Sequence, residues 1–225
     1  MGKNTIIVAF IYLIGIALFL VFNEINYRRL KIKGEISRKF AHFVSILSTI
    51  PFPYIFTSHW FVLILASIFS LVLFISQNGA QLNSIHDIKR KSIGSYLLPL
   101  SIYITFLISE LAGCRLIYIL PMLILAISDP MAAIVGMSME KYNHRIKIFG
   151  IDTKKSMFGS GAFFISSLVI SLIALYFNRD NFDATTILLS MAVALAGTLG
   201  EIFSWRGSDN LSVPLSVILI LIIFM

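Results

Sequence analysis

The chain has 225 residues, of which 58% are hydrophobic and only 13% are charged, and its mean hydropathy is +0.91. Soluble domains have about twice that fraction of charged residues. The composition therefore excludes a soluble domain and predicts an integral membrane protein. The net charge of +7 is explained by membrane topology and by attraction to anionic lipid headgroups. We predict no nucleic-acid binding, because no basic segment is interleaved with aromatic residues. A single cysteine, Cys114, excludes an internal disulfide.

Apolar windows of about 20 residues predict an all-α, polytopic protein with eight transmembrane helices in one domain, residues 1–225. The windows lie near 4–23, 40–57, 59–77, 94–112, 116–137, 158–177, 184–204 and 210–225. The first lacks a small-residue cleavage site and is therefore predicted to be a retained helix. The prolines in "ISDP" and "DNLSVP" predict that two of these helices are broken, as at the midplane sites of transporters.

The positive residues lie in alternate loops. Of the 18 Lys and Arg residues, all but Lys3, Arg115 and Arg179 fall at 24–39, at 78–93, at 138–157 or at Arg206. Because positive loops stay on the cytoplasmic side, both termini are predicted to be non-cytoplasmic. The short chain without eukaryotic targeting elements favours a bacterial inner membrane, with the endoplasmic reticulum as the alternative.

Acidic residues occur where apolar helices approach the predicted cytoplasmic side. Asp129 lies within the fifth predicted helix, Glu201 lies near the end of the seventh, and Asp209 with Asn210 opens the eighth. A charge at membrane depth costs roughly 2.5–3.5 kcal/mol even on the lenient insertion scale, so such residues usually have a function. Their shared level predicts a site at which a charged cytosolic ligand meets a lipid.

Small residues share a helix face with each buried acid. Ala132, Ala133 and Gly136 follow Asp129 at helical spacing, and a similar small face precedes Glu201. Such faces allow a helix or a ligand to approach closely. The alternative for both acids is a structural one, in which each carboxylate pairs with a lysine inside the helix packing.

Two basic segments complete the predicted site. In "SRKFAHFVS", the polar side chains Arg38, His42, Ser45 and Thr49 form one stripe beside Lys39, which could hold an anion, with His42 as hydrogen-bond donor or general base. The alternative is that Arg38 and Lys39 extend to lipid headgroups.

A second basic segment, "GIDTKKSMFGSG" at 150–161, precedes the sixth predicted helix. Its Lys155, Ser156, Gly159 and Ser160 could bind phosphate at the start of that helix. The order of glycine and lysine is the reverse of the usual phosphate loop. A positive loop with a serine cap is the alternative.

Acids for a divalent cation, a phosphate-binding loop and a basic stripe are together typical of phosphoryl transfer. The sequence also resembles the polytopic CTP-dependent lipid kinases, namely dolichol kinase, phytol kinase and the CTP-using diacylglycerol kinase. The resemblance extends from residue 36 to the end. It rests on "RKFAH" (38–42), "IHDIKRKSIGSYLLPL" (85–100), "SDPMAAIVG" (128–136), "KSMFGS" (155–160) and "GEIFSWRGSDNLSVPL" (200–215).

This resemblance implies transfer of the γ-phosphate of CTP to the hydroxyl of a lipid alcohol. The matching positions are Arg38, Lys39, His42, Asp129, Ala133, Gly136, Lys155, Ser156, Gly159, Ser160, Glu201, Gly207, Asp209, Asn210 and Pro214. We expect Asp129 and Glu201 to hold Mg²⁺, Lys155 with residues 156–160 to bind the triphosphate, and Asp209 or His42 to take the hydroxyl proton. Glu140 departs from the pattern, since many relatives carry a glycine there.

Two other functions remain open at this point. A phosphatidate cytidylyltransferase would also use CTP, a divalent metal and a lipid, but its long C-terminal signature is absent. A small transporter is permitted by the predicted helix breaks, although acids and cations gathered at one face favour an enzyme. The acceptor lipid and the oligomeric state are not predicted.

Overall fold

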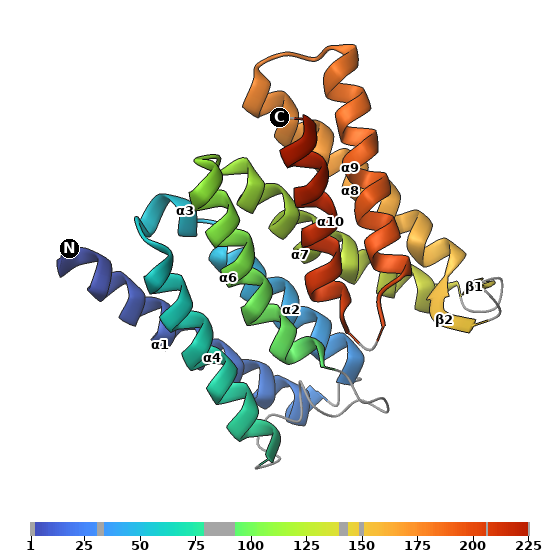
Figure 1. The fold of residues 1–225 in the computed structure, drawn as a ribbon. Helices are drawn as coiled ribbons and strands as arrows, with labels where there is room; N and C mark the ends of the chain where they lie inside the picture. Colours follow the sequence, from blue (N-terminus) through green and yellow to red (C-terminus); the bar gives the residue numbers. More distant parts are fainter. Residues whose placement is uncertain are drawn as a thin grey trace.

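A computed structural model describes residues 3–30, 34–78, 93–139, 144–148, 151–205 and 207–224, which form helices and one β-hairpin (Figure 1). Within these described residues, six helices are long and apolar enough to cross a membrane. They are α1 (Lys3–Leu30), α4 (His59–Asn78), α6 (Gly94–Ala112), α7 (Leu116–Ser138), α8 (Met157–Arg179) and α9 (Ala184–Ile202). The predicted helical membrane protein is confirmed. The count of eight spans and the side of the termini stay predictions.

The remaining helices are short: α2 (Gly34–Thr49), α3 (Phe52–Ile55) and α10 (Asp209–Phe224). The predicted helix over 40–57 is present only as far as Thr49, because α2 ends before Pro51 and a separate turn of helix follows. A proline disfavours helical geometry in the residue before it, which here is Ile50. The structure also extends α1 through Arg28, whose Nε donates to Glu24 Oε1 at 2.6 Å.

The predicted helix breaks were wrong. Helix α7 continues across Pro121 and Pro130, and α10 continues across Pro214. Membrane helices tolerate a proline where neighbouring helices pack around it. Close to Pro130, Ser167 of α8 donates to the Ser128 hydroxyl at 3.0 Å. The feature that favoured a transporter is therefore absent from α7 and α10.

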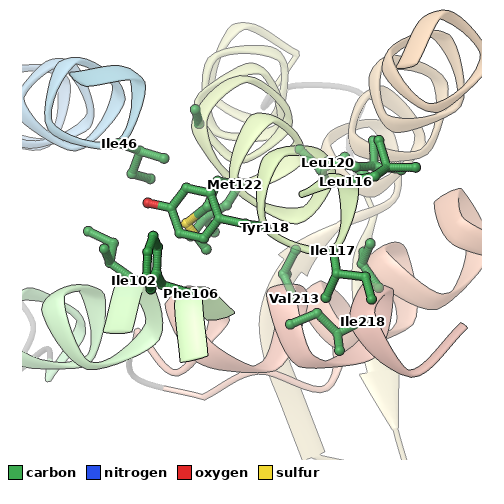
Figure 2. Packing of buried hydrophobic residues seen from close by; sticks show 14 of the residues in the cluster. Ile46, Ile102, Phe106, Leu116, Ile117, Tyr118, Leu120, Met122, Val213 and Ile218 are labelled. Atoms are coloured by element: carbon green, nitrogen blue, oxygen red, sulfur yellow. The ribbon is translucent and has the colours of Figure 1, made fainter. Parts of the chain in front are cut away.

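Helix α7 lies at the centre of the bundle and packs against α2, α6, α8 and α10. Its Tyr118 is fully buried and lies between Ile46 of α2 and Ile102 and Phe106 of α6 (Figure 2). The rings of Tyr118 and Phe106 meet edge to face with centroids 5.7 Å apart. A densely packed central helix provides a rigid support for Asp129, two turns from its end.

Helix α1 lies at the edge of the bundle, beside α2 and α4 (Figure 1). Only 6% of its spanning segment is buried. Leu20 of α1, Ala41 of α2 and Leu73 of α4 form a small apolar cluster that is separate from the main core. Farther toward its N-terminus, α1 packs against the main core through Ala9, Tyr12 and Leu13.

A two-stranded antiparallel hairpin stands where a loop was expected, with β1 (Arg145–Ile148) paired to β2 (Ile151–Ser156). Ile146, Ile148, Ile151 and Thr153 are β-branched and suit strands. The Thr153 hydroxyl donates to the Ile146 carbonyl at 2.8 Å. Strand β2 runs directly into α8, so the hairpin fixes Lys155 at the bundle's edge. We call this edge the hairpin end (Figure 1).

Candidate active site

Five charged side chains from five different elements meet at the hairpin end. They come from α2, α7, β2, α9 and α10 and form what we call the charge cluster, namely Lys39, Asp129, Lys155, Glu201 and Asp209. Every member was predicted as a site residue. The sequence predicted that these residues lie at one depth in the membrane, and the structure brings their side chains together.

The first half of the cluster joins α2 to α7. Lys39 Nζ donates to Asp129 Oδ2 at 2.5 Å, and His42 Nε2 lies 3.5 Å from the same oxygen. All three residues are buried. His42 Nε2 has no hydrogen-bond partner among the described residues. One carboxylate thus faces a lysine and an imidazole that lie one helical turn apart.

The second half joins β2 to α9 and α10. Lys155 Nζ lies 2.8 Å from Glu201 Oε1 and 3.2 Å from Asp209 Oδ2. The hydroxyl of Ser160, in the first turn of α8, donates to Glu201 Oε2 at 3.0 Å. Glu201 is only 4% exposed. Both oxygens of this carboxylate therefore have partners, and Lys155 connects two acids.

The two halves act on each other electrostatically. Asp129 contributes to the field at Lys155, and both Asp129 and Lys39 contribute to the field at Asp209. Burial alone lowers the pKa of Lys155, but the carboxylates of Asp209, Glu201 and Asp129 more than offset it and hold that pKa above its ordinary value. Lys155 is consequently a permanent cation at neutral pH.

The backbone at the start of α8 is already engaged within the protein. Ser156 is the N-cap, and its Oγ accepts from the Gly159 N–H at 3.2 Å. The Met157 N–H donates to the His144 carbonyl at 3.0 Å. The serine cap is therefore present, and two of the N–H groups that a phosphate would use have other partners. Phosphate binding here would depend mainly on the Lys155 side chain.

The small face of α7 packs against α8. A Cβ added to Gly159 would lie 2.9 Å from the Ala132 carbonyl oxygen, and one added to Gly136 would lie 2.9 Å from Ser156 Oγ. Ala133, one residue after Ala132, is half-buried. Close helix packing thus explains Gly136 and Gly159 without a bound nucleotide.

The small face before Glu201 also packs against α10, because a Cβ added to its Gly197 would lie 3.3 Å from Val217 Cγ2. Gly200 of α9 approaches α10, where an added Cβ would lie 3.0 Å from the Ser212 carbonyl oxygen. The Ser212 hydroxyl donates to the Gly200 carbonyl at 2.8 Å. This contact holds Glu201 beside the start of α10 and so beside Asp209.

The remaining predicted positions lie around the charge cluster. Asn210 is buried, and its Nδ2 donates to the Gly94 carbonyl at 2.7 Å, which ties α10 to α6. Gly207 has φ +93°, a value that favours glycine just before α10 begins. Arg38 is half-buried near His42. Pro214 is buried within α10.

Some predicted positions lie on residues that the structure does not describe. One contact of α1 was not predicted from the sequence. Glu140, Arg206 and the basic segment 85–92 lie outside the described residues. The resemblance begins at residue 36 and leaves α1 out, but the buried Asn23 of α1 accepts from the Ser37 hydroxyl at 3.2 Å and so contacts α2 just before Lys39. A polar "NE" pair in the last turns of an otherwise apolar helix was the available signal.

The donor set is compatible with a magnesium ion that arrives with phosphates. Among the described residues, no three His, Cys, Asp or Glu side chains are grouped closely enough to hold a metal alone. Mg²⁺ commonly uses one or two protein carboxylates together with water and substrate phosphates. Asp129 and Glu201, on neighbouring sides of the cluster, could supply these carboxylates.

Known proteins match the chain only over part of their length. It is 36% identical over 104 residues to an uncharacterized protein of Rickettsia prowazekii, covering 45% of this chain and 46% of that protein. It is 32% identical over 141 residues to a phytol kinase of Synechocystis, covering 62% of this chain and 58% of that kinase. The chain thus spans about half the length of the curated relatives it matches. No protein-family model and no solved structure matches it.

Proposed function

We propose that the chain is a membrane lipid kinase that transfers the γ-phosphate of CTP to the hydroxyl of a long-chain lipid alcohol at the charge cluster. The observation that carries the proposal is the meeting of three carboxylates and two lysines at the hairpin end, of which Lys39, Asp129 and Glu201 are buried and the other two are half-buried. Helix packing alone would need no such concentration, because buried ion pairs contribute little net stability. Similarity to the phytol kinase supplies the reaction type.

The cluster can exchange its internal ion pairs for contacts with a nucleotide. Lys155 and Lys39 now bind carboxylates, and phosphate oxygens can take those places. The carboxylates of Asp129 and Glu201 released in this way would hold Mg²⁺, which supplies neutralisation of the phosphate charge when it is bound. Lys155 stays charged throughout, since its pKa lies above the ordinary value.

The hydroxyl proton needs an acceptor near the transferred phosphate. His42 Nε2 is buried, lacks a hydrogen-bond partner among the described residues and lies 3.5 Å from Asp129. As His42 takes the proton, the bond from the lipid oxygen to the γ-phosphorus forms, the bond to the β-phosphate oxygen breaks, and CDP leaves. Asp209, whose carboxylate lies 3.2 Å from Lys155 Nζ, is the second candidate for this role.

Labelled CTP tests the proposal. Purified protein in lipid is supplied with Mg²⁺ and a mixture of phytol, polyprenol and diacylglycerol, with γ-labelled CTP in one incubation and α-labelled CTP in another. We expect lipid label only from γ-labelled CTP, with CDP as the product. Lipid label from α-labelled CTP with pyrophosphate release would instead identify a cytidylyltransferase. No label from either would leave transport as the function to test.

The proposal also sets the side of the membrane. A kinase that consumes cytosolic CTP needs its hairpin end in the cytoplasm, in agreement with the distribution of Lys and Arg. We propose the bacterial inner membrane as its location. The positive residues around the site also favour contact with anionic headgroups of that leaflet.

A further inference from the structure

A small cavity lies directly beside the charge cluster, between α1, α2, α4, α6 and α10. Its volume is about 40 Å³. His42 and Asn210 form part of its polar wall, and Leu20, Phe69 and Leu73 form part of its apolar wall. The cavity therefore joins an apolar environment to residues next to Asp129 and Asp209.

The polar wall includes an imidazole with one ring nitrogen that makes no hydrogen bond among the described residues. His42 is 7% exposed, and its Nε2 has no hydrogen-bond partner among the described residues. That Nε2 lies 3.5 Å from Asp129 Oδ2 of α7, and the imidazole that carries it forms part of the cavity wall. A hydroxyl at this position would lie next to the imidazole that the proposed reaction uses as its base.

The apolar wall leads toward the membrane. Leu20 and Leu73 belong to the separate cluster between α1, α2 and α4, and α1 is the edge helix, with only 6% of its apolar window buried. In Figure 1, α1 and α4 stand on the side of the bundle away from α8 and α9. A lipid chain that extends from the cavity past Leu20 and Leu73 would reach the bilayer between α1 and α4.

The size of the cavity limits what can enter. At least roughly 10–15 Å³ is needed for a single water, so about 40 Å³ admits only a few non-hydrogen atoms. A primary alcohol on one chain presents a hydroxyl and its carbon. Diacylglycerol brings two ester groups close to its hydroxyl and needs more space.

We propose that this cavity receives the hydroxyl end of a single-chain primary alcohol, with the apolar chain leaving between α1 and α4, and that it excludes diacylglycerol. The inference rests on the proposed function, because it assigns the acceptor of that reaction. Ala41, which also lines the cavity and is 5% exposed, sets its width.

The kinetics of two matched Ala→Leu variants test the assignment. Ala41→Leu fills the cavity, and Ala17→Leu makes the same change on an exposed position of α1. We expect Ala41→Leu to raise KM for phytol at least about tenfold while KM for CTP stays within about twofold, because only the acceptor site is filled. Ala17→Leu should leave both constants unchanged. Equal kinetics of the two variants, or wild-type turnover of diacylglycerol equal to that of phytol, would overturn the inference.

Photolabelling of the wild-type protein gives a test that needs no turnover. A long-chain primary alcohol carrying a diazirine near its hydroxyl is compared with its methyl ether. We expect the alcohol to label the peptides that contain Leu20 and Phe69, and the ether to label them far less. Equal labelling by both probes would refute the cavity as a hydroxyl site. Absence of phosphoryl transfer in the wild type, with selective labelling retained, would refute the kinase reaction alone.

Discussion

Lys39 and Asp129 form a buried ion pair whose structural and catalytic contributions can be measured separately. Asp129→Asn should lower turnover at least about a hundredfold, since a carboxylate of the cluster is lost. It should also destabilise the protein by up to roughly 3–5 kcal/mol, because Lys39 remains buried without its charged partner. The double variant Lys39→Met, Asp129→Asn should recover most of that stability but no activity. Thermal unfolding in detergent and γ-phosphate transfer measure the two effects.

Asp180→Asn is the matched control, because Asp180 is exposed at the C-terminal end of α8 and has φ +50°, which asparagine also tolerates. Asp180→Asn should change neither the stability nor the turnover. Wild-type turnover in purified Asp129→Asn would remove Asp129 from the mechanism. Recovery of activity in the double variant would assign the ion pair a structural role only.

Lys155 should matter for the nucleotide more than for the lipid. Lys155→Ala removes a charged donor worth about 1.5–3 kcal/mol, so CTP binding should weaken by roughly ten- to a hundredfold. Lys147→Ala removes a lysine from an exposed position of the same hairpin and should have little effect. Equilibrium binding of CTP, measured with and without phytol, tests this. Equal loss of affinity for both substrates would count against a phosphate-binding role.

The protonation of Lys155 makes a further prediction about pH. Its pKa is raised in the folded protein, so its contribution to stability and to binding is fully present below the unfolded value of about 10.4 and is lost only above it. CTP affinity should therefore stay constant between about pH 8 and pH 10. A titration of CTP binding across this window checks it, and a loss of affinity centred near pH 9 would show that Lys155 is not held as a cation.

Sequence reasoning identified each member of the charge cluster but not the pairs. Lys39 and Asp129 are 90 residues apart, and Lys155 and Asp209 are 54 apart. Hydropathy and helical spacing determine which side chains share a face of one helix, but they do not determine which helix that face packs against. The structural alternative, a carboxylate paired with a lysine, also proved to describe the contacts of both Asp129 and Glu201.

At the scale of elements, long apolar helices were predicted well and short polar elements were not. The predicted span 94–112 coincides with α6, whereas the hairpin of β1 and β2 was taken for a loop. A transmembrane helix carries a strong average signal over 20 residues. A six-residue strand such as β2 carries almost none, and its pairing with β1 depends on contacts rather than on composition.

The junction of β2 with α8 depends on a close approach to α7, and Gly159 tests it. Gly159→Ala should destabilise the protein by about 1–3 kcal/mol, because the new Cβ meets the Ala132 carbonyl oxygen at 2.9 Å. Activity should fall as well, since α8 carries Ser160 against Glu201. Gly161→Ala, whose Cβ meets nothing within 4 Å, should leave stability unchanged or slightly higher. Thermal unfolding of both variants measures the difference. Equal changes in stability for Gly159→Ala and Gly161→Ala would contradict the role of close packing.

At the scale of the whole molecule, the central helix α7 and the edge helix α1 have different roles. Helix α7 is 50% buried over its span and holds Asp129 against α2. Helix α1 has only 6% of its apolar window buried and borders the cavity beside the charge cluster. A rigid nucleotide side and a lipid-exposed acceptor side suit an enzyme whose substrates arrive from water and from the bilayer.

The proposed reaction requires the hairpin end to face the cytosol, and a pair of introduced cysteines tests this orientation. In a Cys114→Ser background the chain has no other cysteine. Lys147→Cys places a thiol on the hairpin, and Ala184→Cys places one at the start of α9, at the opposite end of the bundle; both positions are exposed. In intact bacterial cells, a membrane-impermeant maleimide should label Ala184→Cys at once and Lys147→Cys only after permeabilisation. The reverse pattern would place Lys155 and Glu201 outside the cell, beyond the reach of cytosolic CTP, and would contradict both the positive-inside prediction and the kinase proposal.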